Sequence, residues 1–504
     1  MIKLSAAQII EATGGTAIGL EGREEQVYAD FATTDSREVQ TGTLFVAKPG
    51  AVTDGHRFIP MAFERGATLA LVEREVLDEQ GVPYPSIQVP DVVLAMGDLA
   101  RYSIEQMRAQ GELTVIGITG SAGKTTTKDL LAAIFTPEGP TVAPVGSYNS
   151  EVGVPLTVFR ADESTRYLVI EMGADHVGNI EYLANIAHPD HGAILKVGTA
   201  HAGEFGGVDN IERTKGELAE GVQPTGSLAL NADDERVLRM ASRSVAPITY
   251  FGVGEKTGAN GQPYERYVAA LNLRTTDAGC PEFTLRLPDG SEYEISSQLI
   301  GEHHVHNLLA AATVAYNSGI SGEKIARALN KAAAASKWRM ARTDRADGVT
   351  VINDAYNAML ELGDASVEEH DRIGRLVVRM NISKLIAVGD ETKPIYNAAH
   401  LEGSWGNEAT WVKTPEEAEQ ILRAEVRPGD IVLFKSSNGA KLGILGDQVA
   451  FAEYTFGAEE EQAPTWLSAG DFVETTDLSD HLAAHLDGAA NGDRTSTEQT
   501  TNEG

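Results

Sequence analysis

The sequence predicts an α/β protein of three successive units, with a parallel sheet in the central one. Its 504 residues are too many for one hydrophobic core, and three domains are a natural division of that length. Strand-like and helix-like patterns alternate along most of the chain, as they do in proteins with parallel sheets. A strand, a glycine loop and a helix start also follow one another directly from Thr114 to Leu130. The central sheet is therefore expected to begin near this loop.

Composition excludes several classes of protein. With 42% hydrophobic and 23% charged residues, the chain is typical of soluble globular proteins. A net charge of −32 argues against nucleic acid or an anionic membrane as the main partner. The single cysteine, Cys280, excludes an internal disulfide framework and suits a reducing compartment. The first residues lack the pattern of a signal peptide, and no apolar run could span a bilayer. We expect a cytoplasmic, monomeric protein without membrane insertion.

The first unit is expected to cover residues 1–108. Ser5 is a suitable cap for a short amphipathic helix that a glycine pair closes. Two strand-like runs follow, Thr43 to Ala47 and Thr68 to Val72, with a helix between them. Two basic residues, Arg37 and Lys48, flank the first run. They could hold a diphosphate or carboxylate, or they could be solvated surface charges, and the sequence favours neither alternative.

The stretch TVIGITGSAGKTTTKDL has the properties of a phosphate-binding loop. Its glycines allow the backbone to approach an anion closely, and the N–H groups at the helix start point toward it. Lys124 supplies a positive charge, and Thr125 supplies a hydroxyl for the magnesium that accompanies a nucleotide. Ile118 stands where the template G-x-x-x-x-G-K-[ST] has its first glycine. A simple strand-to-helix turn is the alternative, but the loop composition favours nucleotide phosphates.

Polar residues follow later strands of the same unit, which is expected to cover residues 109–340. The buried-strand pattern RYLVI ends at Glu171, where a carboxylate could reach magnesium beside Thr125. A further strand from Gly192 to Val197 leads to His201, which is predicted to lie at the same rim. Lys215 lies in a helix-like segment. Each residue also has a structural alternative. Glu171 could be an ordinary turn residue, His201 could be a polar group hydrogen-bonded within the protein, and Lys215 could be a solvated surface lysine.

The rest of the central unit continues with strands and then a helix. Strand-like runs at 227–231 and 248–252 precede an alternating stretch at 262–297. This stretch, with the turn 288–290, is predicted to form an antiparallel hairpin attached to the parallel sheet. The following segment GEHHVHNLLAA begins polar and continues as an alanine-rich helix, so its polar head could reach a nucleotide cleft.

The third unit, residues 341–454, is predicted to be a smaller α/β domain. Strands are expected at 349–353, 384–388, 410–412 and 430–435, with helices between them. From Thr455 to the end, eleven acidic residues face one basic residue, Arg494. This composition predicts a disordered acidic tail over residues 455–504.

Taken together, the ordered motifs resemble the Mur ligase family, the ATP-dependent amide-forming enzymes of peptidoglycan precursor synthesis. The resemblance covers about residues 20–450 and rests on TGSAGKTTT, SYNSEVGVPLT, VIEMGA, AHAGEFGG, LNADDE, GEHHVHNLLAA and DAYNA in family order. It implies a three-domain fold whose central domain resembles P-loop ATPases and whose last domain is Rossmann-like. The EMG and DAYNA elements are similar to those of members that join D-alanyl-D-alanine to UDP-N-acetylmuramoyl-tripeptide.

The resemblance also implies roles for individual residues. An acyl phosphate would form from the substrate carboxylate and ATP, and Lys215 would carry a carbamate. Lys124, Glu171, His201 and Lys215 would be catalytic, and Mg²⁺ would be held by Thr125, Glu171, His201 and Lys215. ATP would be bound by Gly120, Ser121, Ala122, Gly123, Lys124, Thr125, Thr126, Asn149, Asn231, His303, Asn307, Arg339 and Asp354. Within this set, Asn231 and His303 would approach the base and ribose, and Asp354 would contact the ribose. The UDP-muramoyl-tripeptide pocket would include Ser36, Arg37, Lys48 and His56.

One departure from the family pattern follows Ala358. Family members continue YNA with Asn-Pro, a helix and a strand, whereas Met359 to Gly363 follow directly here. On the order of 30 residues are missing, the size of a helix and a strand. The last sheet is therefore predicted to be truncated, and either to pair the strand at 349–353 with a non-native neighbour or to leave an edge exposed. Ligation is expected to be weak or absent. The alternatives are a sibling ligase with another substrate, or a degenerate homologue that binds nucleotide or precursor without ligation.

Overall fold

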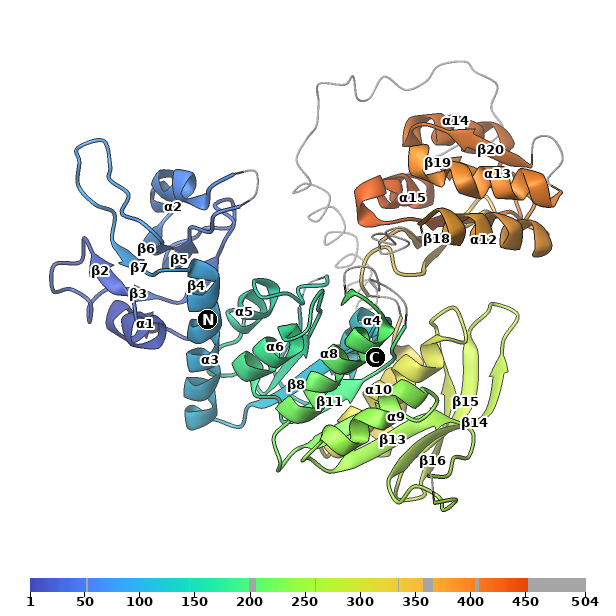
Figure 1. Cartoon of the computed structure of the whole chain (residues 1–504), viewed down its shortest axis with the longest axis horizontal. Coiled ribbons are helices and arrows are strands. Elements are labelled where there is room, and N and C mark those ends of the chain that lie inside the picture. The colour runs from blue at the N-terminus through green and yellow to red at the C-terminus, as the bar shows by residue number, and fades with distance from the viewer. Residues whose placement is uncertain are drawn as a thin grey trace, which may run out of the picture.

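The computed structural model describes residues 1–50, 53–144, 146–198, 205–258, 260–333, 335–356, 366–403 and 408–451. Figure 1 shows three groups of elements that follow one another along the chain, with the central group between the other two. Within these described ranges, no helix combines the length and the apolar character that a membrane span requires.

The first group of elements is built on a small sheet with strand order β2-β7-β6-β5-β4. Helix α1 begins after Ser5, whose hydroxyl accepts from Gln8 N, while the Gln8 side chain accepts from Ser5 N. This capping box and the left-handed Gly14 at the other end confirm the predicted helix. The elements are β1 (Leu4–Ser5), α1 (Ala6–Thr13), β2 (Thr16–Ile18), β3 (Tyr28–Ala29), β4 (Phe31–Thr33), β5 (Thr43–Val46), η1 (Gly55–Phe58), α2 (Ile59–Glu64), β6 (Ala67–Val72) and β7 (Ser86–Gln88).

Helix α3 (Val92–Gln110) joins the first group to the central one. It packs against α1 on one side and against α5 and α6 of the central group on the other. Its apolar residues belong to one continuous core that runs from Met1 to Ala246. The proposed boundary at residue 108 therefore lies within the last turn of α3.

The central sheet contains the phosphate loop. Its strand order in the described residues is β16-β15-β14-β13-β12-β11-β8-β10-β9. The strands from β9 to β14 are parallel, and β15 and β16 add an antiparallel hairpin, as the sequence predicted. The strands are β8 (Thr114–Thr119), β9 (Thr141–Val142), β10 (Tyr167–Glu171), β11 (His191–Ile194), β12 (Ser227–Asn231), β13 (Ile248–Val253), β14 (Tyr267–Thr275), β15 (Pro281–Arg286) and β16 (Glu292–Ser296).

Helices cover both faces of this sheet. Helices α4, α10 and α11 pack together on one face, and α5, α6 and α8 lie on the other. Because both faces are covered, the parallel strands are almost entirely apolar and buried. The helices are α4 (Lys124–Phe135), α5 (Gly153–Val158), α6 (Asn179–Ala187), α8 (Val208–Gly221), α9 (Glu235–Arg239), η2 (Met240–Arg243), α10 (His304–Asn317) and α11 (Gly322–Lys331).

The third group has two separate small sheets in the described residues, β17-β18-β21 and β19-β20. Helix α15 covers one face of the first sheet, and α13 and α14 contact the second, with α12 packed on α13. The elements are β17 (Ala341–Asp344), β18 (Thr350–Asp354), α12 (Ser366–Arg379), β19 (Leu385–Val388), η4 (Asp390–Thr392), α13 (Lys393–Glu402), β20 (Ala409–Val412), α14 (Pro415–Glu425), β21 (Ile431–Lys435), η5 (Asn438–Ala440) and α15 (Leu442–Phe451).

In the described residues the third group's strands form two separate sheets, and one edge of β21 has no partner strand, which agrees with one of the two predicted outcomes. Strand β21 pairs with β18 on one side and with no other described strand. Ile431 and Leu433 on its uncovered face are 69% and 54% exposed, although both are apolar. A crossover helix and a strand after Ala358 would cover such a face and join the two sheets. Ala358 itself, the whole segment 357–365 and the proposed tail 455–504 lie outside the described residues.

Candidate active site

The loop between β8 and α4 has the backbone that a phosphate cradle requires. Gly120 and Gly123 have φ values of 156° and 85°, which L side chains rarely adopt. A Cβ on Gly123 would also lie 2.2 Å from Asn307 Oδ1. The glycine thus allows α10 to bring Asn307 against the loop, and the ATP contact that the family resemblance implies for Asn307 stays a prediction.

Lys124 lies over the loop that it follows. Its ammonium donates to the carbonyl of Gly120 at 2.9 Å. Burial lowers the pKa of Lys124, the Glu171 carboxylate opposes this shift and the Arg339 charge adds to it. The Ser121 hydroxyl is buried and has no hydrogen-bond partner among the described residues. A lysine charge and an unpaired hydroxyl at one glycine loop are suited to phosphate oxygens.

Thr125 and Glu171 lie together at the carboxyl ends of β8 and β10. The Thr125 hydroxyl donates to Glu171 Oε2 at 2.9 Å, and Asn149 Nδ2 donates to Glu171 Oε1 at 2.8 Å. Ser147 Oγ is 3.1 Å from the Thr125 hydroxyl. Glu171 is only 1% exposed, so its carboxylate faces this polar group rather than solvent. A hydroxyl and a carboxylate beside a phosphate loop are the oxygen ligands that Mg²⁺ prefers, and these residues fit that ion.

Replacing Glu171 by glutamine should raise the Mg²⁺ concentration needed for half-maximal activity by roughly tenfold or more, because the variant loses a charged ligand. Phosphate release measured across a Mg²⁺ titration tests this expectation. Replacing the exposed Glu220 by glutamine is the matched control, since among the described residues its ion pair is with Arg243 on the surface. An unchanged Mg²⁺ requirement in the Glu171 variant would contradict the assignment.

Lys215 extends from α8 into an apolar environment. The residue is 4% exposed, and its ammonium lies 6.0 Å from the centre of the Phe205 ring. Burial and the nearby Lys124 charge lower the pKa of Lys215 to about 7. A solvated lysine would be exposed and would keep an ordinary pKa, so the structure disfavours the solvated-lysine alternative for Lys215. His201, the other proposed ligand at this rim, lies outside the described residues, which contain no group of three acidic, histidine or cysteine ligands.

The linker from α11 to β17 brings Arg339 to the same place. Its guanidinium donates to Ser147 Oγ at 2.9 Å and lies 4.6 Å from the centre of the Tyr356 ring. Ser147 therefore connects Arg339 to Thr125, a contact that the sequence analysis missed, although Ser147 begins the quoted motif SYNSEVGVPLT. The arrangement brings a cation from the linker to the phosphate loop.

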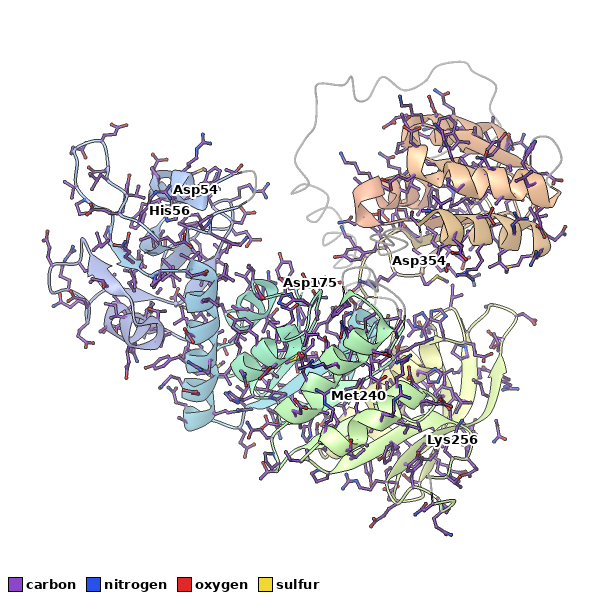
Figure 2. The ribbon with its side chains drawn as sticks, viewed as in Figure 1. Asp54, His56, Asp175, Met240, Lys256 and Asp354 are labelled. Carbon is purple, nitrogen blue, oxygen red and sulfur yellow. The ribbon has the colours of Figure 1, made fainter. Side chains whose placement is uncertain are left out.

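Asp354 and His303 face each other across the junction of the central and third groups. Burial lowers the pKa of His303, and the Asp354 carboxylate opposes this shift. Asp354 itself accepts hydrogen bonds from Lys435 Nζ at 2.6 Å and from Met340 N at 3.2 Å. Figure 2 shows Asp354 at the side of the third group that faces the central one. Its proposed contact with the ribose stays a prediction.

Asn231, predicted to approach the base, uses its side chain within the protein. Its amide donates to Leu195 O at 2.8 Å and accepts from Asp233 N at 2.9 Å. Asp233 in turn faces His306 at 3.0 Å and Lys256 at 2.6 Å. This cluster ties the β12 loop to α10, and the sequence analysis missed it because the partners lie far apart in the chain. A base contact by Asn231 remains untested.

The four residues proposed for precursor binding belong to the first group of elements, and His56, the one labelled in Figure 2, lies well apart from Asp354. Arg37 forms an ion pair with Asp35, and Arg65 donates to the carbonyls of Ser36 and Arg37. His56 is buried, accepts from Glu73 N through Nε2 and donates from Nδ1 to Asp54. His56 therefore shapes the loop after Lys48, and its contact with substrate stays a prediction, as does that of the other three.

Comparison with known proteins agrees with this geometry. The family description "Mur ligase middle domain" matches residues 118–315, and "Mur ligase family, catalytic domain" matches residues 29–103. The UDP-N-acetylmuramoyl-tripeptide–D-alanyl-D-alanine ligase of Mycobacterium tuberculosis H37Rv is 40% identical, over 89% of this chain and 98% of the relative. The enzyme of the same name from Escherichia coli K12 is 29% identical, over 79% and 89%.

Solved structures give the same result. A crystal structure of MurF from Acinetobacter baumannii superposes with a TM-score of 0.76 at 29% identity, covering 89% of this chain and 99% of that one. The MurF ligase of Thermotoga maritima in complex with ADP gives a TM-score of 0.66 at 25% identity, covering 82% and 96%. The mycobacterial alignment extends over 512 positions, more than this chain contains, so the relative has segments opposite gaps here. Phosphate loop, buried lysine, matched domains and superposed structures agree: the chain belongs to the Mur ligase family.

Proposed function

We propose that this protein is the ATP-dependent ligase that joins D-alanyl-D-alanine to UDP-N-acetylmuramoyl-tripeptide in peptidoglycan precursor synthesis. The observation that carries the proposal is that α4, β10, α8 and the linker after α11 bring their polar side chains together at one phosphate loop. Thr125 and Glu171 lie 2.9 Å apart beside Lys124, the buried Lys215 lies within its electrostatic reach, and Arg339 arrives from the linker. The names of the relatives add the substrates.

The arrangement supports transfer of a phosphoryl group to a carboxylate. The tripeptide carboxylate attacks the γ-phosphate of ATP to give an acyl phosphate, and the amine of D-alanyl-D-alanine then displaces phosphate. Lys124 and the loop N–H groups hold the phosphates, while Arg339 offsets charge that develops during transfer. Thr125 and Glu171 would hold Mg²⁺, which would further neutralise the charge on the phosphate oxygens. Approach of the third group of elements excludes water from the acyl phosphate.

The remaining parts of the proposal concern binding and location. The first group of elements would hold the UDP-muramoyl-tripeptide through Ser36, Arg37, Lys48 and the loop shaped by His56. His201 and a carbamate on Lys215 would bind a second Mg²⁺. The enzyme would act as a cytoplasmic monomer without nucleic-acid partners. The non-ligating alternative is not favoured, since the named relatives that align over most of their length are ligases.

The decisive test is phosphate release from ATP by the purified 504-residue protein. We expect release only when UDP-muramoyl-tripeptide and D-alanyl-D-alanine are both present, with the pentapeptide product identified by mass. Parallel reactions with lysine and meso-diaminopimelate in the third position identify the tripeptide. Omission of each component in turn is the control. Precursor binding without any phosphate release would support the non-ligating homologue instead.

A further inference from the structure

The linker between α11 and β17 is held by the second turn of the phosphate-loop helix. Asp129 Oδ2 accepts from Ser336 N at 3.1 Å, and Lys128 Nζ lies 3.4 Å from Ser336 Oγ. Lys128 also donates to the carbonyl of Pro144 at 3.0 Å and pairs with Asp129 at 2.5 Å. The two side chains are 4% and 16% exposed, so solvent screens this group of contacts only weakly.

Ordinary helix geometry does not explain the pairing of Lys128 with Asp129. Adjacent residues of a helix point about 100° apart, and their side chains do not normally face each other. Here both side chains bend toward Ser336 and meet at the linker. A buried lysine that only stabilised α4 would be costly compared with an apolar residue. The contact with Ser336 indicates that this charged pair holds the linker as well as belonging to α4.

The other end of the linker is held by the third group of elements. Trp338 Nε1 donates to Asp447 Oδ2 at 2.9 Å, and the indole packs on Gly443, where a Cβ would lie 2.4 Å from the ring. Met340 N donates to Asp354. Trp338 and Met340 have φ values of 59° and 52°, an unfavourable conformation for bulky residues that the contacts on both sides impose. Only Lys337 separates the two points of attachment.

Arg339 follows these two attachment points directly, so its position depends on where the linker is attached to α4. We propose that Lys128 and Asp129 are positioning residues: they fix the central end of the linker so that Arg339 meets Ser147 at the phosphate loop. Helix α4 then has two roles. Its first turn holds the phosphates through Lys124 and Thr125, and its second turn holds the linker through Lys128 and Asp129. This inference rests on the proposed function for its effect on turnover, but the attachment itself does not.

The test compares Asp129→Asn with a matched control, Asp190→Asn. Asp190 likewise accepts one backbone N–H, from Val115 at 2.8 Å, and pairs with one cation, Arg108, at 2.8 Å, but it lies at the α3 junction. Two readouts are measured well below the melting temperatures: the rate of tryptic cleavage after the exposed Lys337 in ligand-free protein, and kcat together with KM for ATP. Lys128→Met, which keeps the buried stem, repeats the test if the first variant folds poorly.

We expect Asp129→Asn to increase cleavage at Lys337 about tenfold and to lower kcat about tenfold, with KM for ATP within roughly twofold, as loss of one charged hydrogen-bond partner allows. Asp190→Asn should change neither value. Cleavage and kcat equal to those of the unmodified protein, or equal changes in the control, would overturn the inference. If the unmodified protein shows no ligation, the proposed function fails, and the cleavage rates still decide whether the pair holds the linker.

Discussion

Lys124→Ala should abolish ligation while leaving the fold intact. We expect turnover to fall by about a thousandfold or more, the size of loss seen when a group that stabilises transition-state charge is removed. The reason is local, because Lys124 supplies a positive charge directly over the loop between β8 and α4. Arg339 approaches from the linker and contacts Ser147, not the Gly120 carbonyl, so it does not supply the charge that Lys124 places there.

The stability of this variant separates catalysis from folding. Folding lowers the pKa of Lys124 because burial disfavours the ammonium, so the charge costs stability at neutral pH. Alanine removes that cost and is a better helix former at this position. The melting temperature should therefore stay level or rise while phosphate release disappears. The exposed Lys324→Ala, which breaks only an ion pair with Glu138, is the control. Near-normal turnover in Lys124→Ala would remove the phosphate-binding assignment.

The geometry of the proposed phosphate site was predictable from sequence because its parts lie close together in the chain. One short loop contains the glycines that set its backbone conformation and the lysine and threonine that carry its polar groups. The position of Glu171 could be predicted because the carboxyl ends of parallel strands lie at one edge of the sheet. The antiparallel hairpin after Gly261 was equally predictable, from its alternating apolar and polar residues and its Pro-Asp-Gly turn. Local patterns of this kind carry enough information to specify both structure and chemistry.

The contacts between distant segments could not be predicted in this way. Nothing local joins Ser336 to Asp129, or His306 to Asp233, since these pairs depend on how α4, α10 and the linker pack. The family resemblance placed His56 in the precursor pocket, but no local pattern predicted that its ring nitrogens contact Asp54 and Glu73 inside the first group of elements. The exposed face of β21 was predictable only because the missing segment after Ala358 removes a whole crossover.

Lys215→Ala should lose most activity, and short carboxylates such as acetate or formate should partly restore it. The proposed carbamate forms only from the neutral amine, and a pKa of about 7 makes a large fraction of Lys215 neutral near physiological pH. An ordinary lysine, with a pKa near 10.4, would be almost entirely protonated there. The carbamate converts this cationic position into an anionic oxygen ligand, which the alanine variant lacks.

The rescue experiment distinguishes this role from loss of packing. Acetate should raise the turnover of Lys215→Ala but not that of Lys124→Ala, where a cation rather than an anion is missing. Lys215→Met fills the apolar space around Phe205 and should fold as well as the unmodified protein, yet its longer side chain leaves no room for the added carboxylate. We therefore expect acetate to restore more activity to Lys215→Ala than to Lys215→Met. Full activity of Lys215→Ala without additives, or equal rescue of all three variants, would show that Lys215 carries no carbamate in the reaction.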